Sequence, residues 1–181
     1  MDIVLWSRAL HFSAKKHAGQ LRKDGFTPYI NHPIEVAYLL TEVGGVRDPV
    51  LVMAALLHDT LEDTQTTLSE LALAFGDEIC SLVQAVSDDK ALPKAERKRL
   101  QIEHAPHLSP KAKQIKLADK ICNLQDILAQ PPADWPLSRR LGYFDWAEQV
   151  GLGLRGVNAA LEARFDQVLA RKAELHLAPD L

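Results

Sequence analysis

The sequence predicts an all-α protein, and three observations lead to that prediction. Apolar residues recur at spacings of three and four along most of the chain, as they do on the buried face of a helix. Residue pairs that favour helix starts, such as Asp48-Pro49 and Ser109-Pro110, directly precede two of these segments. No segment shows the alternation of apolar and polar residues that is typical of a half-buried strand. We therefore expect a bundle of helices.

Length and composition are those of an ordinary folded domain. The chain has 181 residues, of which 47% are hydrophobic and 25% charged. Because no Gly/Ser-rich linker divides it, we expect a single domain over residues 1–181. A net charge of −3 and a pI near 6.2 argue against a general nucleic-acid binder and favour a small ligand.

The chain lacks the signals of secretion and of membrane insertion. Residues 1–8 have no basic region followed by a long apolar core, and the longest apolar run, Val50–Leu57, is too short to cross a bilayer. We therefore expect a cytoplasmic protein without a membrane partner. Cys80 and Cys122 fall among apolar helical neighbours, which indicates reduced core residues. Nothing in the sequence favours one oligomeric state over another.

The first half of the chain predicts five helices and one irregular loop. The helices are expected at residues 2–16, from a first turn that contains Pro33 to about residue 43, and at residues 48–57, 67–75 and 77–86. A capping box at Thr67–Glu70 marks the start of the fourth helix, and Gly76 marks its end. Gly25 and Pro28 interrupt the periodicity between residues 19 and 31, so we expect a loop there.

The second half predicts a charged helical segment and three further helices. The charged segment includes residues 94–99, and a charge run of this kind is usually the solvated face of a helix. Pro106 and Pro110 mark the connection that follows. The three helices are expected at residues 110–130, 137–150 and 152–173.

A cluster of polar side chains follows the most apolar helix, which ends at Leu57. At 3.6 residues per turn, Glu62 lies one turn beyond His58, and Asp63 lies one turn beyond Asp59. Such groups are seldom buried unless they are paired or bind a metal, and the His-Asp pair offers one nitrogen and one oxygen ligand. The pattern predicts a metal site with adjacent acid-base carboxylates. The alternative is a helix that simply ends at His58.

Two more candidate ligands stand elsewhere in the chain. His32 lies at the entrance of the helix that follows the loop, where a lone histidine more often caps or packs. Asp119 lies within the apolar segment 115–121 and begins a polar stripe that continues through Asn123 and Asp126. A polar stripe usually faces solvent, but this apolar context favours a packed carboxylate that would complete a metal site.

These residues together resemble a known family of enzymes. His32, His58-Asp59 and Asp119 match the H…HD…D pattern of HD-domain metal-dependent phosphohydrolases, whose fold is a helical bundle around one metal. The surrounding words are similar to the hydrolase domain of RelA/SpoT proteins, and the similarity covers nearly the whole chain. The words are GQLRK (19–23), PYINHP (28–33), HDTLEDT (58–64) and KLADKICNL (116–124).

The resemblance implies an activity and a cofactor. RelA/SpoT hydrolase domains remove the 3′-pyrophosphate of the alarmone ppGpp, in the stringent response, and Mn²⁺ is the implied metal. Since the chain ends at Leu181, we expect the type of the stand-alone small alarmone hydrolases called metazoan SpoT homologues. In this scheme Glu62 and Asp63 orient or deprotonate the attacking water. Asp126 departs from the threonine that many long members carry.

Substrate contacts are expected from a few further residues. Arg22 and Lys23 precede His32 on the loop; the planar guanidinium suits a guanine face, and the lysine suits a phosphate. Asn123 and Tyr143 would contact the ribose and base. The alternatives are that both loop cations are merely solvated, or that the charged segment 94–99 holds the nucleotide.

Three other functions compete with (p)ppGpp hydrolysis. The same site could remove the ribose phosphate of NADPH, an activity that the resemblance to stand-alone members also implies. A cyclic-nucleotide phosphodiesterase of the HD-GYP type is disfavoured, because Gly142-Tyr143-Phe144 lacks the proline of that motif. A non-catalytic nucleotide sensor is disfavoured by the intact pair Glu62-Asp63.

Overall fold

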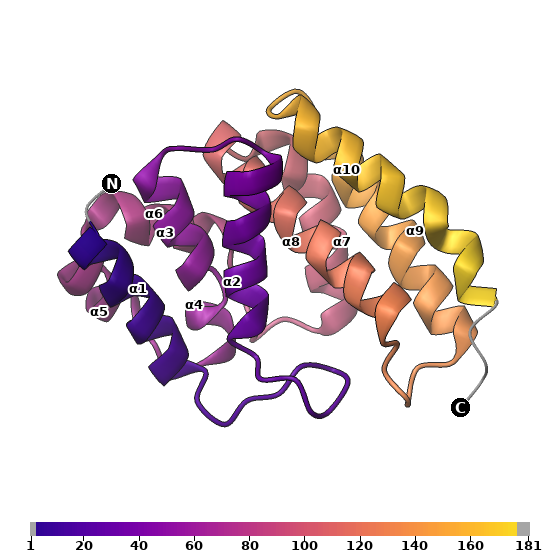
Figure 1. Ribbon diagram of the computed structural model, residues 1–181, viewed down its shortest axis with the longest axis horizontal. Coiled ribbons are helices and arrows are strands. Elements are labelled where there is room, and N and C mark those ends of the chain that lie inside the picture. Colours follow the sequence, from indigo (N-terminus) through magenta and orange to yellow (C-terminus); the bar gives the residue numbers. More distant parts are fainter. Residues whose placement is uncertain (1–2, 177–181) are drawn as a thin grey trace.

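The computed structural model describes residues 3–176, and the part of the chain that it describes contains helices and no strand (Figure 1). One isolated antiparallel bridge joins Leu21 to Pro28 within the expected loop. The main helices are α1 (Ile3–Lys16), α2 (Asn31–Tyr38), α3 (Pro49–Leu57), α4 (Thr60–Asp63), α5 (Leu68–Phe75), α6 (Asp77–Val86), α7 (Lys94–His104), α8 (Pro110–Ala129), α9 (Leu137–Gly153) and α10 (Ala159–Ala170). The all-helical prediction is confirmed.

Helix α3 lies in the core. All of its side chains from Leu51 to Leu57 are buried, and α1, α2 and α6 pack around it. A helix that is apolar on every side must be surrounded in this way. Its start is fixed by the Asp48 carboxylate, which accepts a hydrogen bond of 2.9 Å from the Val50 backbone N–H. Because α3 is rigidly packed, the residues that follow Leu57 leave the core at a defined place.

Helix α8 is the second buried element, and it runs through the middle of the molecule in Figure 1. It packs against α2, α6, α9 and α10. Every side chain from Leu117 to Leu124 is buried, including the polar side chains of Asp119, Lys120 and Asn123. Three adjacent polar groups in the middle of a core helix need partners or a ligand.

Two expected helices differ from those observed. The helix expected to have Pro33 in its first turn begins at Asn31 and runs to Val43 as expected, but its last turn, Leu39–Val43, is a π-helix. The helix expected at 152–173 begins only at Ala159 and is followed by a 3₁₀ segment over Arg171–His176. Its first expected residues instead extend α9 to Gly153.

The physical reason for the second difference is the turn between α9 and α10. Gly156 adopts a φ of +86°, a left-handed conformation that a helix cannot contain. Asn158 then caps α10 by accepting a hydrogen bond from the Leu161 N–H at 3.2 Å. Apolar spacing alone predicted a helix through this turn, because Leu152 and Leu154 continue the helical period.

Close packing of α9 on α10 depends on a glycine. A Cβ atom built on Gly151 would overlap the ring of Phe165, which is fully buried. Gly142, in the same helix, has open space at that position.

Other expectations about the chain can be checked directly. Cys80 and Cys122 are buried and free, as expected. The charged segment lies in α7, a helix without a single buried side chain. Across residues 3–176, no helix combines the length and the apolar character that crossing a bilayer requires. Met1 and Asp2, where the first helix was expected to begin, lie outside the described residues.

Candidate metal centre and substrate cavity

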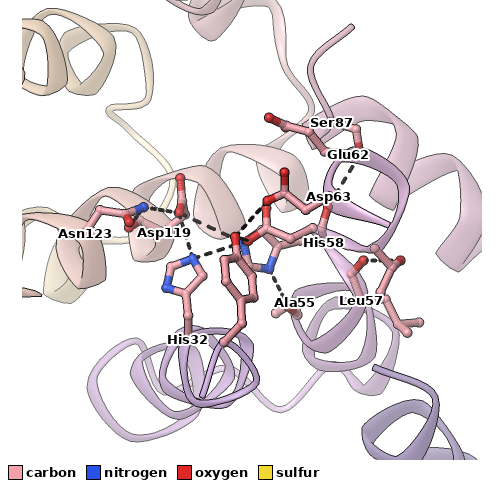
Figure 2. Close-up of polar contacts among 12 residues, drawn as sticks. His32, Ala55, Leu57, His58, Glu62, Asp63, Ser87, Asp119 and Asn123 are labelled. Carbon is pink, nitrogen blue, oxygen red and sulfur yellow. Dashed lines mark hydrogen bonds and ion pairs between the residues drawn. The ribbon is translucent and has the colours of Figure 1, made fainter. Parts of the chain in front are cut away.

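Four side chains from three parts of the fold converge at one point (Figure 2). His32 comes from the first turn of α2, His58 and Asp59 come from the break between α3 and α4, and Asp119 comes from the middle of α8. Ligand atoms of His32, His58 and Asp59 all lie within 4.8 Å of one another. Asp119 Oδ1 lies 3.2 Å from His32 Nε2 and 4.0 Å from His58 Nε2. The sequence-predicted ligands are therefore brought together.

The chemistry of this cluster fits a divalent cation. His58 Nδ1 lies 2.7 Å from the Ala55 carbonyl, so it carries the proton and donates. His58 Nε2 is then left with its lone pair, has no hydrogen-bond partner within residues 3–176, and faces Asp59 Oδ2 at 3.1 Å. A buried lone pair facing a carboxylate is unfavourable unless a positive charge lies between them. Two imidazoles and two carboxylates suit a borderline divalent metal.

The electrostatics of the cluster lead to the same conclusion. Burial opposes a charge on His58, yet the Asp59 carboxylate raises the pKa of that imidazole to about 9. Burial likewise opposes the charge of Asp59, but His58 and His32 hold the pKa of the carboxyl below its usual range. The carboxylates of the cluster thus stabilise a positive charge between them, and either a proton or a metal ion can supply that charge.

Neighbouring side chains fix the orientation of Asp119. Lys120 Nζ donates to Asp119 Oδ2 at 2.9 Å, and Asn123 Nδ2 donates to Asp119 Oδ1 at 2.5 Å. Burial opposes the charge on Asp119, but Lys120, His32 and His58 together outweigh burial and lower the pKa of the carboxyl well below its usual range. This carboxylate is therefore held ionised with one oxygen directed at the two histidines.

Glu62 and Asp63, the predicted acid-base pair, stand beside the cluster but in different surroundings. Glu62 accepts a hydrogen bond from the Asp88 backbone N–H at 3.0 Å, and its nearest cation is Arg97 at 3.5 Å. Burial, followed by the charge of Asp88, raises the pKa of Glu62. Asp63 is held more firmly, because Lys90 Nζ lies 2.5 Å from its Oδ1 atom.

Tyr29 is a site residue that the sequence analysis missed as a functional group. Its hydroxyl lies 2.8 Å from Asp59 Oδ2 and 2.8 Å from Asp63 Oδ2, so it bridges the His-Asp cluster and the predicted acid-base pair. The ring of His17 stacks on its ring with centroids 4.7 Å apart. The position of Tyr29 three residues before His32 was the available signal, since a turn in which the His32 N–H donates to the Tyr29 carbonyl at 3.0 Å brings the two together.

A cavity of about 650 Å³ opens beside the cluster. Nine lysines or arginines and six aspartates or glutamates line it, whereas the whole chain has 21 basic and 24 acidic residues. The lining is thus net positive by three in a protein that is net negative by three. A cavity of this charge favours an anionic ligand.

Three of the lining lysines form no ion pair with any described residue. They are Lys23, Lys94 and Lys98. Lys23 Nζ lies over the rings of Trp135 and Tyr143 at 5.2 and 5.3 Å, and Lys98 Nζ lies 4.6 Å from the centroid of Trp146. Burial, followed by the charge of Arg22, lowers the pKa of Lys23 to about 8.

The other predicted substrate residues differ in whether their side chains already form hydrogen bonds within the protein. Arg22 donates to Asp126 Oδ2 at 2.6 Å and to Asn123 Oδ1 at 2.9 Å, so Arg22 and Asn123 belong to a network that ends on Asp119. The face of the Arg22 guanidinium also lies 5.4 Å from the Tyr29 ring centroid. Tyr143 lines the cavity, and its hydroxyl forms no hydrogen bond within residues 3–176.

Sequence reasoning also missed part of the cavity wall. Trp135, Arg139 and Trp146 were not expected at the site, and Lys94 and Lys98 were expected only as an alternative. The charge run itself was visible in the sequence. The sequence did not show which side of α7 faces the cavity, because Lys94 and Lys98 lie at i and i+4 on a helix that is charged on several sides.

Comparisons with known proteins agree with this geometry. An HD-domain family model matches residues 9–141. Guanosine-3′,5′-bis(diphosphate) 3′-pyrophosphohydrolase MESH1 of Xenopus tropicalis is 52% identical over 92% of this chain and 94% of its own length. The human MESH1 is 56% identical over 91% of this chain and 92% of its own length.

A solved structure has the same fold. It is described as a metazoan ortholog of SpoT that hydrolyzes ppGpp, and it matches with a TM-score of 0.91 and 44% identity over 94% of this chain and 96% of that chain. Since the family model covers more than half of the chain and both relatives match it nearly end to end, this chain belongs to the HD-domain family, in the group that MESH1 represents.

Proposed function

We propose that this protein is a metal-dependent 3′-pyrophosphohydrolase of guanosine-3′,5′-bis(diphosphate) and of its pentaphosphate form, releasing pyrophosphate and GDP or GTP. One observation carries the proposal: a His₂Asp₂ cluster opens into the same cavity as three lysines that lack a carboxylate partner among the described residues. A substrate with two separate diphosphates needs both features. The function of the MESH1 relatives supports the same substrate.

The metal would be held by His32, His58, Asp59 and Asp119. With four protein ligands, about two positions of an octahedral Mn²⁺ remain for water and a phosphate oxygen. When bound, the metal supplies a water molecule of lowered pKa and polarises the phosphoryl group. The Ala55 carbonyl keeps His58 in the tautomer whose Nε2 can bind metal.

Glu62 and Asp63 would divide the acid-base work. Glu62 sits in a buried environment that raises its pKa, which brings it closer to the value that suits proton transfer near neutral pH. Asp63 is fixed by Lys90 and Tyr29, which suits a carboxylate that orients water. A new O–P bond forms from the attacking water to the phosphorus that carries the 3′ oxygen, and the 3′ O–P bond breaks. A proton from the attacking water moves to Glu62, and the leaving 3′ oxygen takes up a proton in exchange. Pyrophosphate and the 3′ hydroxyl are the products.

The remaining residues would bind the parts of the nucleotide that do not react. The 5′ diphosphate can bind to Lys23, Lys94 and Lys98, because no carboxylate among the described residues competes for these lysines. Arg22 is already fixed by Asp126 and Asn123, so its guanidinium is a preorganised surface against which the guanine can stack. The free Tyr143 hydroxyl can donate to a ribose or phosphate oxygen.

Product identification tests the proposal and separates it from its alternatives. Metal-stripped and Mn²⁺-reloaded protein would be incubated with ppGpp, pppGpp and NADPH, and the phosphate products quantified. We expect pyrophosphate from both guanosine substrates, only after reloading. Release of orthophosphate from NADPH, without hydrolysis of ppGpp or pppGpp, would overturn the proposal in favour of the NADPH 2′-phosphatase alternative. Tight nucleotide binding without any turnover would replace it by a sensor.

A further inference from the structure

A second cavity, of about 340 Å³, adjoins the substrate cavity. The two cavities share five lining residues, which are Val86, Asp88, Arg97, Gln101 and Lys116. Two of these, Arg97 and Gln101, lie one turn apart on α7. Since Arg97 also contacts Glu62, a ligand in the second cavity would be separated from the proposed acid-base residue by one side chain.

One part of the second cavity is apolar. Its aliphatic lining residues include Leu92, Leu100, Leu108, Val150 and Leu154. The first three of these leucines are only partly buried, so they expose apolar surface at the cavity. Its volume is within the usual range for small-molecule sites, and this lining suits an aliphatic body.

The shared wall contains polar groups that are poorly satisfied. The Arg97 guanidinium has five N–H donors, but its one contact within residues 3–176 is a 3.5 Å approach of Nη1 to Glu62 Oε1. Arg97 Nε and Gln101 Oε1 are both buried without a hydrogen-bond partner in the described part of the chain. A buried unsatisfied group costs about 1 to 3 kcal/mol. The observed position of Arg97 is therefore weakly held, and an acceptor in the second cavity would draw the guanidinium toward it.

The charges around the second cavity define the acceptor. Two acidic residues, Asp88 and Asp89, and two basic residues, Arg97 and Lys116, line it. This balance leaves no surplus positive charge for a phosphate dianion. A single carboxylate fits, because a guanidinium pairs with it through two parallel hydrogen bonds.

We propose that the second cavity binds a small aliphatic carboxylate, which turns Arg97 away from Glu62 and from the substrate cavity and so weakens nucleotide binding. The binding part of this inference is independent of the enzyme's substrate. The regulatory part rests on the proposed function, because it requires that the substrate cavity hold an anionic nucleotide.

Binding is tested by calorimetric titration of the metal-loaded protein with octanoate. We expect one site per chain, weaker binding of 1-octanol, which lacks the charge, and none of acetate, which lacks the body. Leu100→Trp should fill the cavity and abolish octanoate binding, and Leu92→Trp gives a second route to the same result. Leu73→Trp is the matched control, because Leu73 is 92% exposed on α5 and outside both cavities. Absence of octanoate binding to the wild type, or equal binding in both cavity variants, would overturn the inference.

The kinetic readout distinguishes regulation from simple competition. With ppGpp as substrate, octanoate should raise KM to a plateau about fivefold above its starting value, the lower end of usual coupling between two sites. A KM that rises without limit would mean that octanoate occupies the substrate cavity, and it would overturn the inference. If octanoate binds but ppGpp is not hydrolysed at all, the proposed function fails while the second site stands.

Discussion

The charge state of Lys23 should control nucleotide capture between pH 7 and 9. Burial, followed by the charge of Arg22, lowers the pKa of this lysine to about 8, and the charge of Asp119 offsets only part of that shift. The protonated form therefore dominates below that pH and is lost above it, so that about 90% is charged at pH 7 and about 10% at pH 9. The substrate phosphates lose their last protons near pH 6, so their charge hardly changes over this interval.

If the lysine must be charged to hold a phosphate, kcat/KM should fall by up to about tenfold from pH 7 to 9, because this ratio reports groups of the free enzyme. Lys23→Arg is the reference, since an arginine stays charged throughout and experiences the same titration of the metal-bound water. The ratio of wild-type to Lys23→Arg kcat/KM for ppGpp should decline with pH, and Lys23→Met should be low at every pH. A constant ratio would show that Lys23 does not meet the nucleotide.

Two further predictions concern the acid-base pair and the packing of α9. Glu62→Gln should keep its metal while kcat falls by roughly 10² to 10⁴, whereas Glu96→Gln, on the exposed side of α7, should behave as wild type; an unchanged kcat would remove Glu62 from the mechanism. Gly151→Ala should lower the free energy of unfolding by about 1 to 3 kcal/mol because the new methyl group overlaps the Phe165 ring, and Gly142→Ala, in open space on the same helix, should raise it by up to about 1 kcal/mol. Equal denaturation midpoints in the two glycine variants would contradict the close approach of α9 and α10.

Three members of the His-Asp cluster were predictable because each carries a local signal. His58 and Asp59 follow an apolar helix directly, and Asp119 lies inside an apolar segment, so each combines polarity with apolar surroundings. Such combinations are rare in a core, and they remain visible without knowledge of the fold. His32 has no such signal and was indicated by the family resemblance.

The substrate cavity was less predictable because it depends on contacts between distant residues. Arg22 pairs with Asp126, 104 positions later, and this contact decides whether its charge is free. Trp135 and Trp146 have no pattern that distinguishes a cavity wall from an ordinary core. The start of α10 was misplaced for a local reason, the left-handed turn at Gly156, which apolar spacing does not detect.

One metal is proposed to lie among His32, His58, Asp59 and Asp119, and the variant Asp119→Asn tests this assignment. The amide keeps the size of the side chain but removes the charge that faces the two histidines. Metal content per chain and ppGpp turnover would be measured on the same preparation of the folded variant. We expect both to be lost together. One bound metal per chain with wild-type turnover would contradict the assignment.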